Sequence, residues 1–132
     1  MENFTPYLKE ADSYFKVVDG NMKKNKKLGN KVLFSIGSMV IEKYLVALLM
    51  AEGLAVTGHS TSGLLAALEN HYGKIPEELN ALNKVDNRMD LCSMDATSTP
   101  DLNDEEMLEF AANLEFLKGF VYNQISKAES AN

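Results

Sequence analysis

The chain is poor in the residues that build covalently linked or metal-bound folds. Its 132 residues include one cysteine, Cys92, and two histidines, His59 and His71, which are twelve positions apart. One cysteine forms no internal disulfide, and this spacing does not place two ligands on one helical face. We therefore expect no structural metal and no cofactor.

Long apolar runs are missing as well. No uninterrupted stretch reaches the roughly 18 residues that a membrane span requires. Residues 1–6 have neither the basic start nor the apolar core of a signal peptide. Glycine-rich phosphate-binding motifs and period-two strand patterns are also absent from the sequence. We expect a cytoplasmic, all-helical protein with no membrane contact and no nucleotide cradle of the common kinds.

The charge is divided unequally along the chain. Residues 1–66 hold eight basic and six acidic side chains, whereas residues 67–132 hold five basic and thirteen acidic ones, which gives the formal net charge of −6. Nucleic-acid binding depends on an excess of lysine and arginine, so this balance disfavours it. The basic run 23–31 is either a local anion-binding patch or a solvated loop between helices, and the second interpretation is favoured.

Helix signals recur along the whole chain. Apolar residues repeat at three- and four-residue spacing, and prolines, glycines and polar caps separate the repeats. A helix is expected from Thr5-Pro6 to about Lys23, a very apolar one from about Asn30 to Glu52, and a short one from a Thr61 or Ser62 cap to Gly73. A fourth begins at Pro76 with the stripe Leu79, Leu82, Val85, Met89 and Cys92, and the last begins at Asp101 or Asn103.

These segments predict one domain over residues 1–132, an antiparallel bundle of four to five helices. Its core should span about residues 5–126, with a disordered tail at 127–132. The inner face of the last helix is expected to hold Met107, Leu108, Phe110, Ala111, Leu114, Leu117, Phe120, Val121 and Ile125. The segment 30–52 is apolar nearly all round, so it should lie in the middle of the bundle or in a subunit interface.

One polar stripe interrupts this apolar segment. Lys31, Ser35, Ser38 and Glu42 follow one another at spacings of four, three and four, so they share one helical face. A carboxylate on a central helix needs a partner, and Arg88, the only arginine, is a candidate. A structural ion pair and two separate solvated charges are the alternatives. Cys92 falls on an apolar stripe, where a buried inert thiol is favoured over a nucleophile.

The segment Ser38-Met39-Val40-Ile41-Glu42-Lys43-Tyr44-Leu45-Val46-Ala47-Leu48-Leu49, followed by Gly53 and by His59 just before Leu64-Leu65-Ala66-Ala67-Leu68, resembles a HEPN domain. The resemblance covers about residues 5–126. It implies an all-α bundle, commonly dimeric, that is associated with nucleotide or RNA binding. Some members are metal-independent ribonucleases of toxin–antitoxin and defence systems, often encoded beside a small nucleotidyltransferase.

The ribonuclease members carry an arginine followed after four to six residues by a histidine. Arg88 occupies the arginine-like position, but Ser93, Met94 and Asp95 stand where the histidine would be. The resemblance therefore favours a non-catalytic module that binds a nucleotide or a partner protein. Its groove would be lined by Ser38, Glu42, Lys43, His59 and Arg88 in a homodimer.

Two alternatives remain open. The chain could be an unusual metal-independent ribonuclease in which Arg88 stabilises phosphate charge and His59 transfers protons. It could also be a purely structural helical interaction protein. The acidic second half, with Glu105, Glu106 and Glu109, favours a basic partner protein over a nucleic acid.

Overall fold

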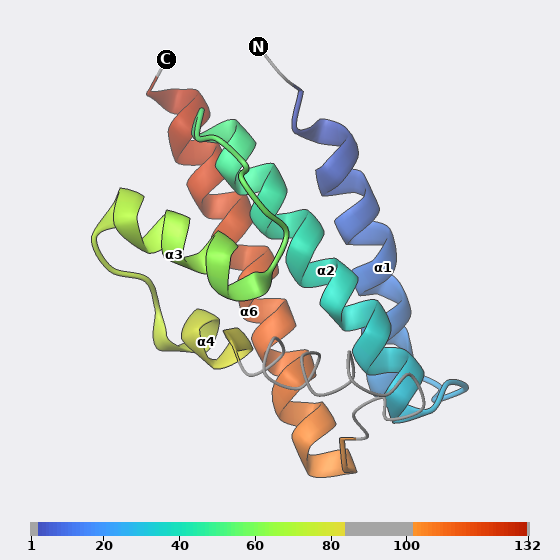
Figure 1. The fold of residues 1–132 in the computed structure, drawn as a ribbon. Helices are drawn as coiled ribbons and strands as arrows, with labels where there is room; N and C mark the ends of the chain where they lie inside the picture. The colour runs from blue at the N-terminus through green and yellow to red at the C-terminus, as the bar shows by residue number, and fades with distance from the viewer. Residues whose placement is uncertain (1–2, 84–101, 132) are drawn as a thin grey trace.

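The computed structural model describes residues 3–83 and 102–131. It is an all-α bundle, as predicted, and the described residues contain no strand (Figure 1). The helices are α1 (Thr5–Lys23), α2 (Asn30–Ala51), α3 (Thr61–Tyr72), α4 (Glu77–Asn80), a 3₁₀ turn (Ala81–Asn83) and α6 (Asp104–Ser130). The predicted stripe beyond Asn83, including Cys92, lies outside the described residues.

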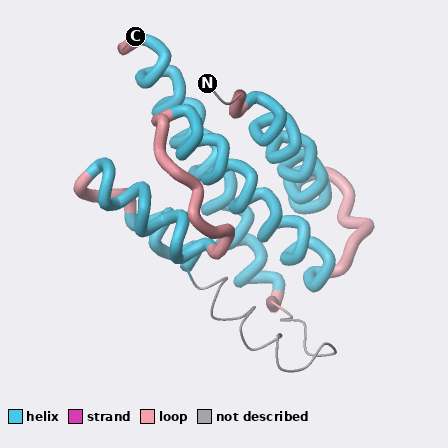
Figure 2. The backbone as a smooth tube through the Cα atoms, turned by 45° about the horizontal axis from the view of Figure 1, so that its top comes forward, coloured by secondary structure: helices cyan, strands magenta, loops and turns pink. Residues whose placement is uncertain are grey.

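Three long helices form the body of the bundle. α1 and α2 pack as an antiparallel pair, and α6 runs in the same direction as α2 on its other side (Figure 1). α3 crosses α2 and α6, and a connector runs back along α2 to reach it (Figure 2). This return path is what brings residues of the connector beside the middle of α2.

Local signals set most helix ends. Proline stands in the first turn of α1, and Gly53 (φ 72°) and Gly73 (φ 89°) follow α2 and α3 in the left-handed region that glycine adopts at low cost. Asn103 caps α6 in a capping box with Glu106. The cap of α3 is Ser60, whose hydroxyl accepts from the Gly63 amide at 3.1 Å, so the predicted cap at Thr61 or Ser62 was wrong by one or two positions.

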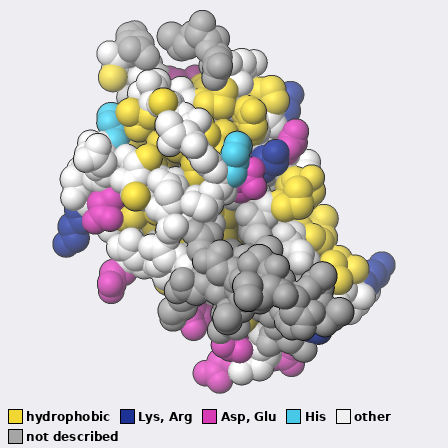
Figure 3. All heavy atoms as spheres, viewed as in Figure 1, with side chains coloured by type: hydrophobic (Ala, Val, Ile, Leu, Met, Phe, Trp, Pro, Cys, Tyr) yellow, Lys and Arg dark blue, Asp and Glu magenta, His cyan; other side chains and the backbone are white. Residues whose placement is uncertain are grey.

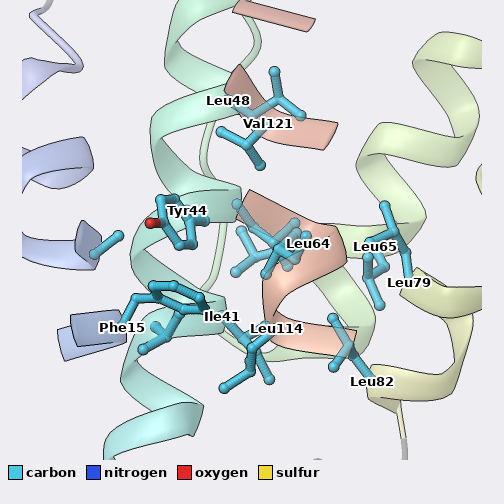
Figure 4. Close-up of a cluster of buried hydrophobic side chains, with 14 of the residues drawn as sticks. Phe15, Ile41, Tyr44, Leu48, Leu64, Leu65, Leu79, Leu82, Leu114 and Val121 are labelled. Atoms are coloured by element: carbon cyan, nitrogen blue, oxygen red, sulfur yellow. The ribbon is translucent and has the colours of Figure 1, made fainter. Parts of the chain in front are cut away.

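The core is centred on α2, which contacts α1, α3 and α6 (Figure 4). From Val40 to Leu49 its side chains are buried through most of the circumference, whereas Val32 and Met39 near its start are 47% and 40% exposed. The fully buried bulky residues of α2 are Leu33, Phe34, Ile41, Tyr44, Leu45, Leu48 and Leu49. α2 is therefore the middle helix of its own chain's bundle, and its part in a subunit interface stays a prediction.

Two predictions about the last helix were wrong. The chain continues as helix to Ser130, so residues 127–130 are not a disordered tail. Ile125 anchors this end in the core, no proline or glycine follows it, and Lys127 carries a positive charge near the C-terminus, where the helix dipole favours it. Leu108 was expected on the inner face but is 59% exposed.

α2 is also long and apolar enough to cross a membrane by length and composition, and 61% of its most apolar window is buried inside the bundle. A central core helix has the same properties. The cytoplasmic location and the homodimer both stay predictions.

Candidate functional site

The polar residues predicted from the sequence lie at the middle of α2 and in the connector before α3. Ser38, Glu42 and Lys43 are on α2, and His59 directly precedes Ser60, the cap of α3. Arg88 lies outside the described residues, as do Ser93, Met94 and Asp95. The predicted Glu42–Arg88 pair is therefore untested, and the described part of the site consists of four side chains.

Glu42 of α2 and His59 of the connector lie next to each other. His59 Nδ1 lies 3.0 Å from Glu42 Oε2, and the two side chains are 62% and 36% exposed. A carboxylate at Nδ1 fixes the ring and leaves Nε2 as the nitrogen directed to other partners. The described residues include no other partner of His59. The pair can accept or donate a hydrogen bond, or transfer a proton, at the surface.

Lys43 has a different partner. Its ammonium lies 3.2 Å from Glu10 Oε2 of α1 and 5.4 Å from the centre of the Tyr7 ring. The hydrogen bond to Glu10 raises the pKa of Lys43, and partial burial opposes that shift. The ammonium thus already has an acceptor on α1, with which a phosphate would have to compete.

Ser38 is used within its own helix. Its hydroxyl donates to the Phe34 carbonyl at 3.0 Å. Two pairs, Glu10–Lys43 and Glu42–His59, lie side by side and form a row of alternating charge. Figure 3 shows a histidine next to acidic and basic side chains on this face. Such a row is a self-paired polar surface with no excess positive charge.

Two further carboxylate clusters were not predicted. Glu52, at the end of α2, accepts from the Tyr72 hydroxyl and lies 3.7 Å from His71 Nε2. Burial and this bond raise the pKa of Tyr72. Both histidines of the chain therefore lie beside glutamates of α2, His59 beside Glu42 within the helix and His71 beside its C-cap, Glu52. The only sequence signal was the similar spacing, ten residues between the glutamates and twelve between the histidines.

The second cluster joins the three long helices. Asp12 of α1 accepts from the hydroxyls of Tyr44 on α2 and Tyr122 on α6. Burial, and then the bond to Asp12, raises the pKa of Tyr44 and raises that of Tyr122 to about 12. This arrangement stabilises the fold and leaves Asp12 committed to tyrosine partners.

The described ranges contain no group of three or more His, Cys, Asp or Glu side chains that could hold a metal ion. No protein-family model matches the chain, and no curated protein or solved structure matches it either. Geometry and charge are therefore the basis on which a function is proposed.

Proposed function

We propose that this chain is a non-catalytic binding module, with a HEPN-like bundle, that recognises a partner protein. The observation that carries the proposal is that the polar groups which could bind a phosphate already have partners within the chain. At the candidate site the ammonium of Lys43 is paired with Glu10, and the hydroxyl of Ser38 bonds within its own helix. Of the described site residues, the Glu42–His59 pair remains at the surface, and it suits hydrogen bonding to polypeptide groups.

The nucleotide interpretation has less support. Lys23 pairs with Asp19 and Glu115, and Lys26 pairs with Asp104, so these lysines of the basic run are also neutralised by neighbouring carboxylates. A phosphate ligand would have to compete with them, in a chain of net charge −6. Arg88 would supply the forked contact if a phosphate bound in the groove with Ser38, Glu42, Lys43 and His59.

The HEPN resemblance suggests the kind of partner. Related modules are often encoded beside a small nucleotidyltransferase in toxin–antitoxin systems, and the product of a neighbouring gene is the first partner to test. Homodimers are common in that superfamily, so the proposal includes a dimer that presents two copies of the Glu42–His59 pair.

The test is co-expression with the product of the neighbouring gene, with the mass of the purified species measured by light scattering. A stable complex is expected, together with no heat of binding for ATP, inorganic phosphate or a short RNA in calorimetry. His59→Ala should weaken the complex, whereas Glu69→Gln, an exposed glutamate of α3, should not. Tight nucleotide or RNA binding in place of a complex would refute the proposal.

One observation favours a second candidate, a metal-independent ribonuclease. His59 is held by Glu42 through Nδ1, which is how a carboxylate orients a histidine that transfers protons. Arg88 would then stabilise the phosphate charge. Cleavage of a labelled RNA in EDTA should be lost in His59→Ala and Arg88→Ala and kept in His71→Ala. Cleavage that survives in His59→Ala would come from a contaminant or another site.

A further inference from the structure

The outer face of α6 carries exposed apolar residues that the described helices leave uncovered. Leu108, Ala112, Phe116 and Gly119 follow one another at spacings of four, four and three, so they form a row about 16 Å long on one side of the helix. Leu108 is 59% exposed and Phe116 is 37% exposed. We call this row the α6 outer stripe.

The shape of the stripe suits a second helix. Ala112 and Gly119 are seven residues apart, which is about two turns, and each leaves the backbone accessible between bulkier neighbours. A Cβ added to Gly119 would meet nothing within 4 Å, and its φ is not positive. Neither packing among the described residues nor backbone conformation therefore requires glycine here, although glycine disfavours a helix interior. A glycine at position 119 would be explained if a side chain of a partner packs against the bare backbone there.

The charges beside the stripe define the partner further. Glu105 and Glu109 flank it on the exposed side of α6, and neither forms an ion pair with any part of the chain that the structure describes. Asp104 and Glu115, in contrast, are paired with Lys26 and Lys23. Figure 3 shows acidic side chains at the end of the molecule where α6 begins.

We infer that the α6 outer stripe docks an amphipathic helix of a partner protein. That helix would place bulky apolar residues over Ala112 and Gly119 and lysines or arginines against Glu105 and Glu109. The inference rests on the proposed function, because it adds to the Glu42–His59 pair a second surface for the same partner and states the chemistry of the partner segment that binds there.

The experiment uses a fluorescent synthetic peptide of about 18 residues, helical, with leucines on one face and lysines and arginines beside them. Its matched control carries glutamates in place of the basic residues. The basic peptide should bind the whole chain in fluorescence anisotropy, more weakly as salt rises, and the acidic peptide should not bind. Equal binding of both peptides would overturn the inference.

Three variants locate the site. Phe116→Ser and Gly119→Leu should each weaken peptide binding roughly tenfold, and E105Q with E109Q should weaken it about threefold and flatten its salt dependence. Val32→Ser, which changes a residue that is 47% exposed on α2, is the control and should bind as the native chain does. Urea unfolding of each variant verifies that it is folded.

The outcomes separate this inference from the proposed function. If the co-expressed complex forms equally with native chain and with Gly119→Leu, the module binds its partner elsewhere and only the inference fails. If no complex forms with either chain, the proposed function fails. If light scattering shows dimers that Gly119→Leu abolishes, a second copy occupies the stripe and the basic helix is excluded as its occupant.

Discussion

At the scale of single residues, carboxylates organise the polar chemistry of this protein. Asp12, Glu42 and Glu52 each hold a tyrosine or a histidine that comes from a different element. Tyr44 shows why this matters, because it is fully buried and its hydroxyl would lose a hydrogen bond without Asp12. The carboxylates therefore add directional hydrogen bonds between elements to the apolar packing.

Three tyrosines, Tyr44, Tyr72 and Tyr122, should make the stability of the fold fall with pH in the alkaline range. The raised pKa values of Tyr44, Tyr72 and Tyr122 mean that the folded chain keeps protons that the unfolded chain loses above about pH 10. The contribution of these tyrosines to the free energy of unfolding should thus be constant below about pH 10 and fall as the pH rises toward 12. Urea unfolding across this range measures the slope. Tyr44→Phe should reduce the slope, and an unchanged slope in that variant would contradict the assignment.

The same bonds give a mutational prediction at pH 7. Asp12→Ala leaves the buried Tyr44 hydroxyl without its acceptor and should lower the free energy of unfolding by about 1–3 kcal/mol. Tyr122→Phe removes only the bond of a residue that is 40% exposed, so its cost should be smaller. Chemical denaturation compares the two. A larger loss for Tyr122→Phe would mean that the exposed bond is the more important one.

The contact between Glu42 and His59 was predicted only in part. The sequence indicated that a carboxylate on an apolar helix needs a partner, with Arg88 as one candidate, and the family resemblance placed His59 in the same groove as Glu42 without pairing the two. The structure places His59 beside Glu42 because the connector runs back along α2, a path that no residue pattern encodes. Ser38 and Lys43 were expected in the same groove, and their partners lie on α2 itself and on α1.

At the scale of elements, glycine has opposite roles at two helical positions. Gly37 lies where α2 crosses α6, and a Cβ added there would come within 2.3 Å of Phe110 Cε2 and 3.2 Å of Leu114 Cδ1. The Phe110 ring is itself packed against Phe34, with ring centres 5.1 Å apart, so it has little room to move. Gly119 on the opposite side of α6 has no such neighbour.

The two glycines form a matched pair for a test. Gly37→Ala should destabilise the chain by about 1–3 kcal/mol, because overpacking at the crossing exceeds the gain in helix propensity. Gly119→Ala should stabilise it by up to about 1 kcal/mol through propensity alone. Thermal unfolding of both variants checks the signs. Stabilisation by Gly37→Ala would mean that α2 and α6 can move apart at no cost.

Helix ends were predictable where a residue acts locally. Pro6, Gly53, Gly73 and Asn103 each impose a backbone angle or a hydrogen bond within one turn, and the structure confirms all four. The tail was mispredicted because the helix end at Ser130 has no such marker. Its persistence depends on tertiary anchoring by Ile125, which a local pattern does not show.

The contribution of a local helix signal to stability can be measured at the N-cap of α6. Asn103 Oδ1 accepts from the Glu106 amide at 2.8 Å, and Glu106 Oε1 accepts from the Asn103 amide at 3.0 Å. Asn103→Ala should lower the free energy of unfolding by about 1 kcal/mol, and Asn103→Ser should retain most of it. Urea unfolding gives both values. An unaffected Asn103→Ala would show that packing alone holds the first turn of α6.

At the scale of the whole molecule, the burial of α2 bears on whether one chain can fold without a second copy. A helix that is apolar all round needs cover on every side, and α1, α3 and α6 of the same chain provide most of it, while Val32 and Met39 stay 47% and 40% exposed. The sequence predicted that cover was needed, but it could not say whether a second subunit or the chain's own helices would supply it. Most of the cover over α2 therefore comes from its own chain.

This burial predicts that folding does not depend on a second copy. The thermal midpoint should stay constant over a protein concentration range of about a hundredfold, because mass action shifts a midpoint only when association contributes to stability. The measurement is circular dichroism against temperature at several concentrations, with the mass at each concentration followed by light scattering. Leu45→Ala, in the centre of α2, should lower the midpoint equally at every concentration, since the cavity it leaves lies within one chain. A midpoint that rises with concentration would instead show that a subunit interface contributes to stability and that part of the cover over the apolar helices comes from a partner.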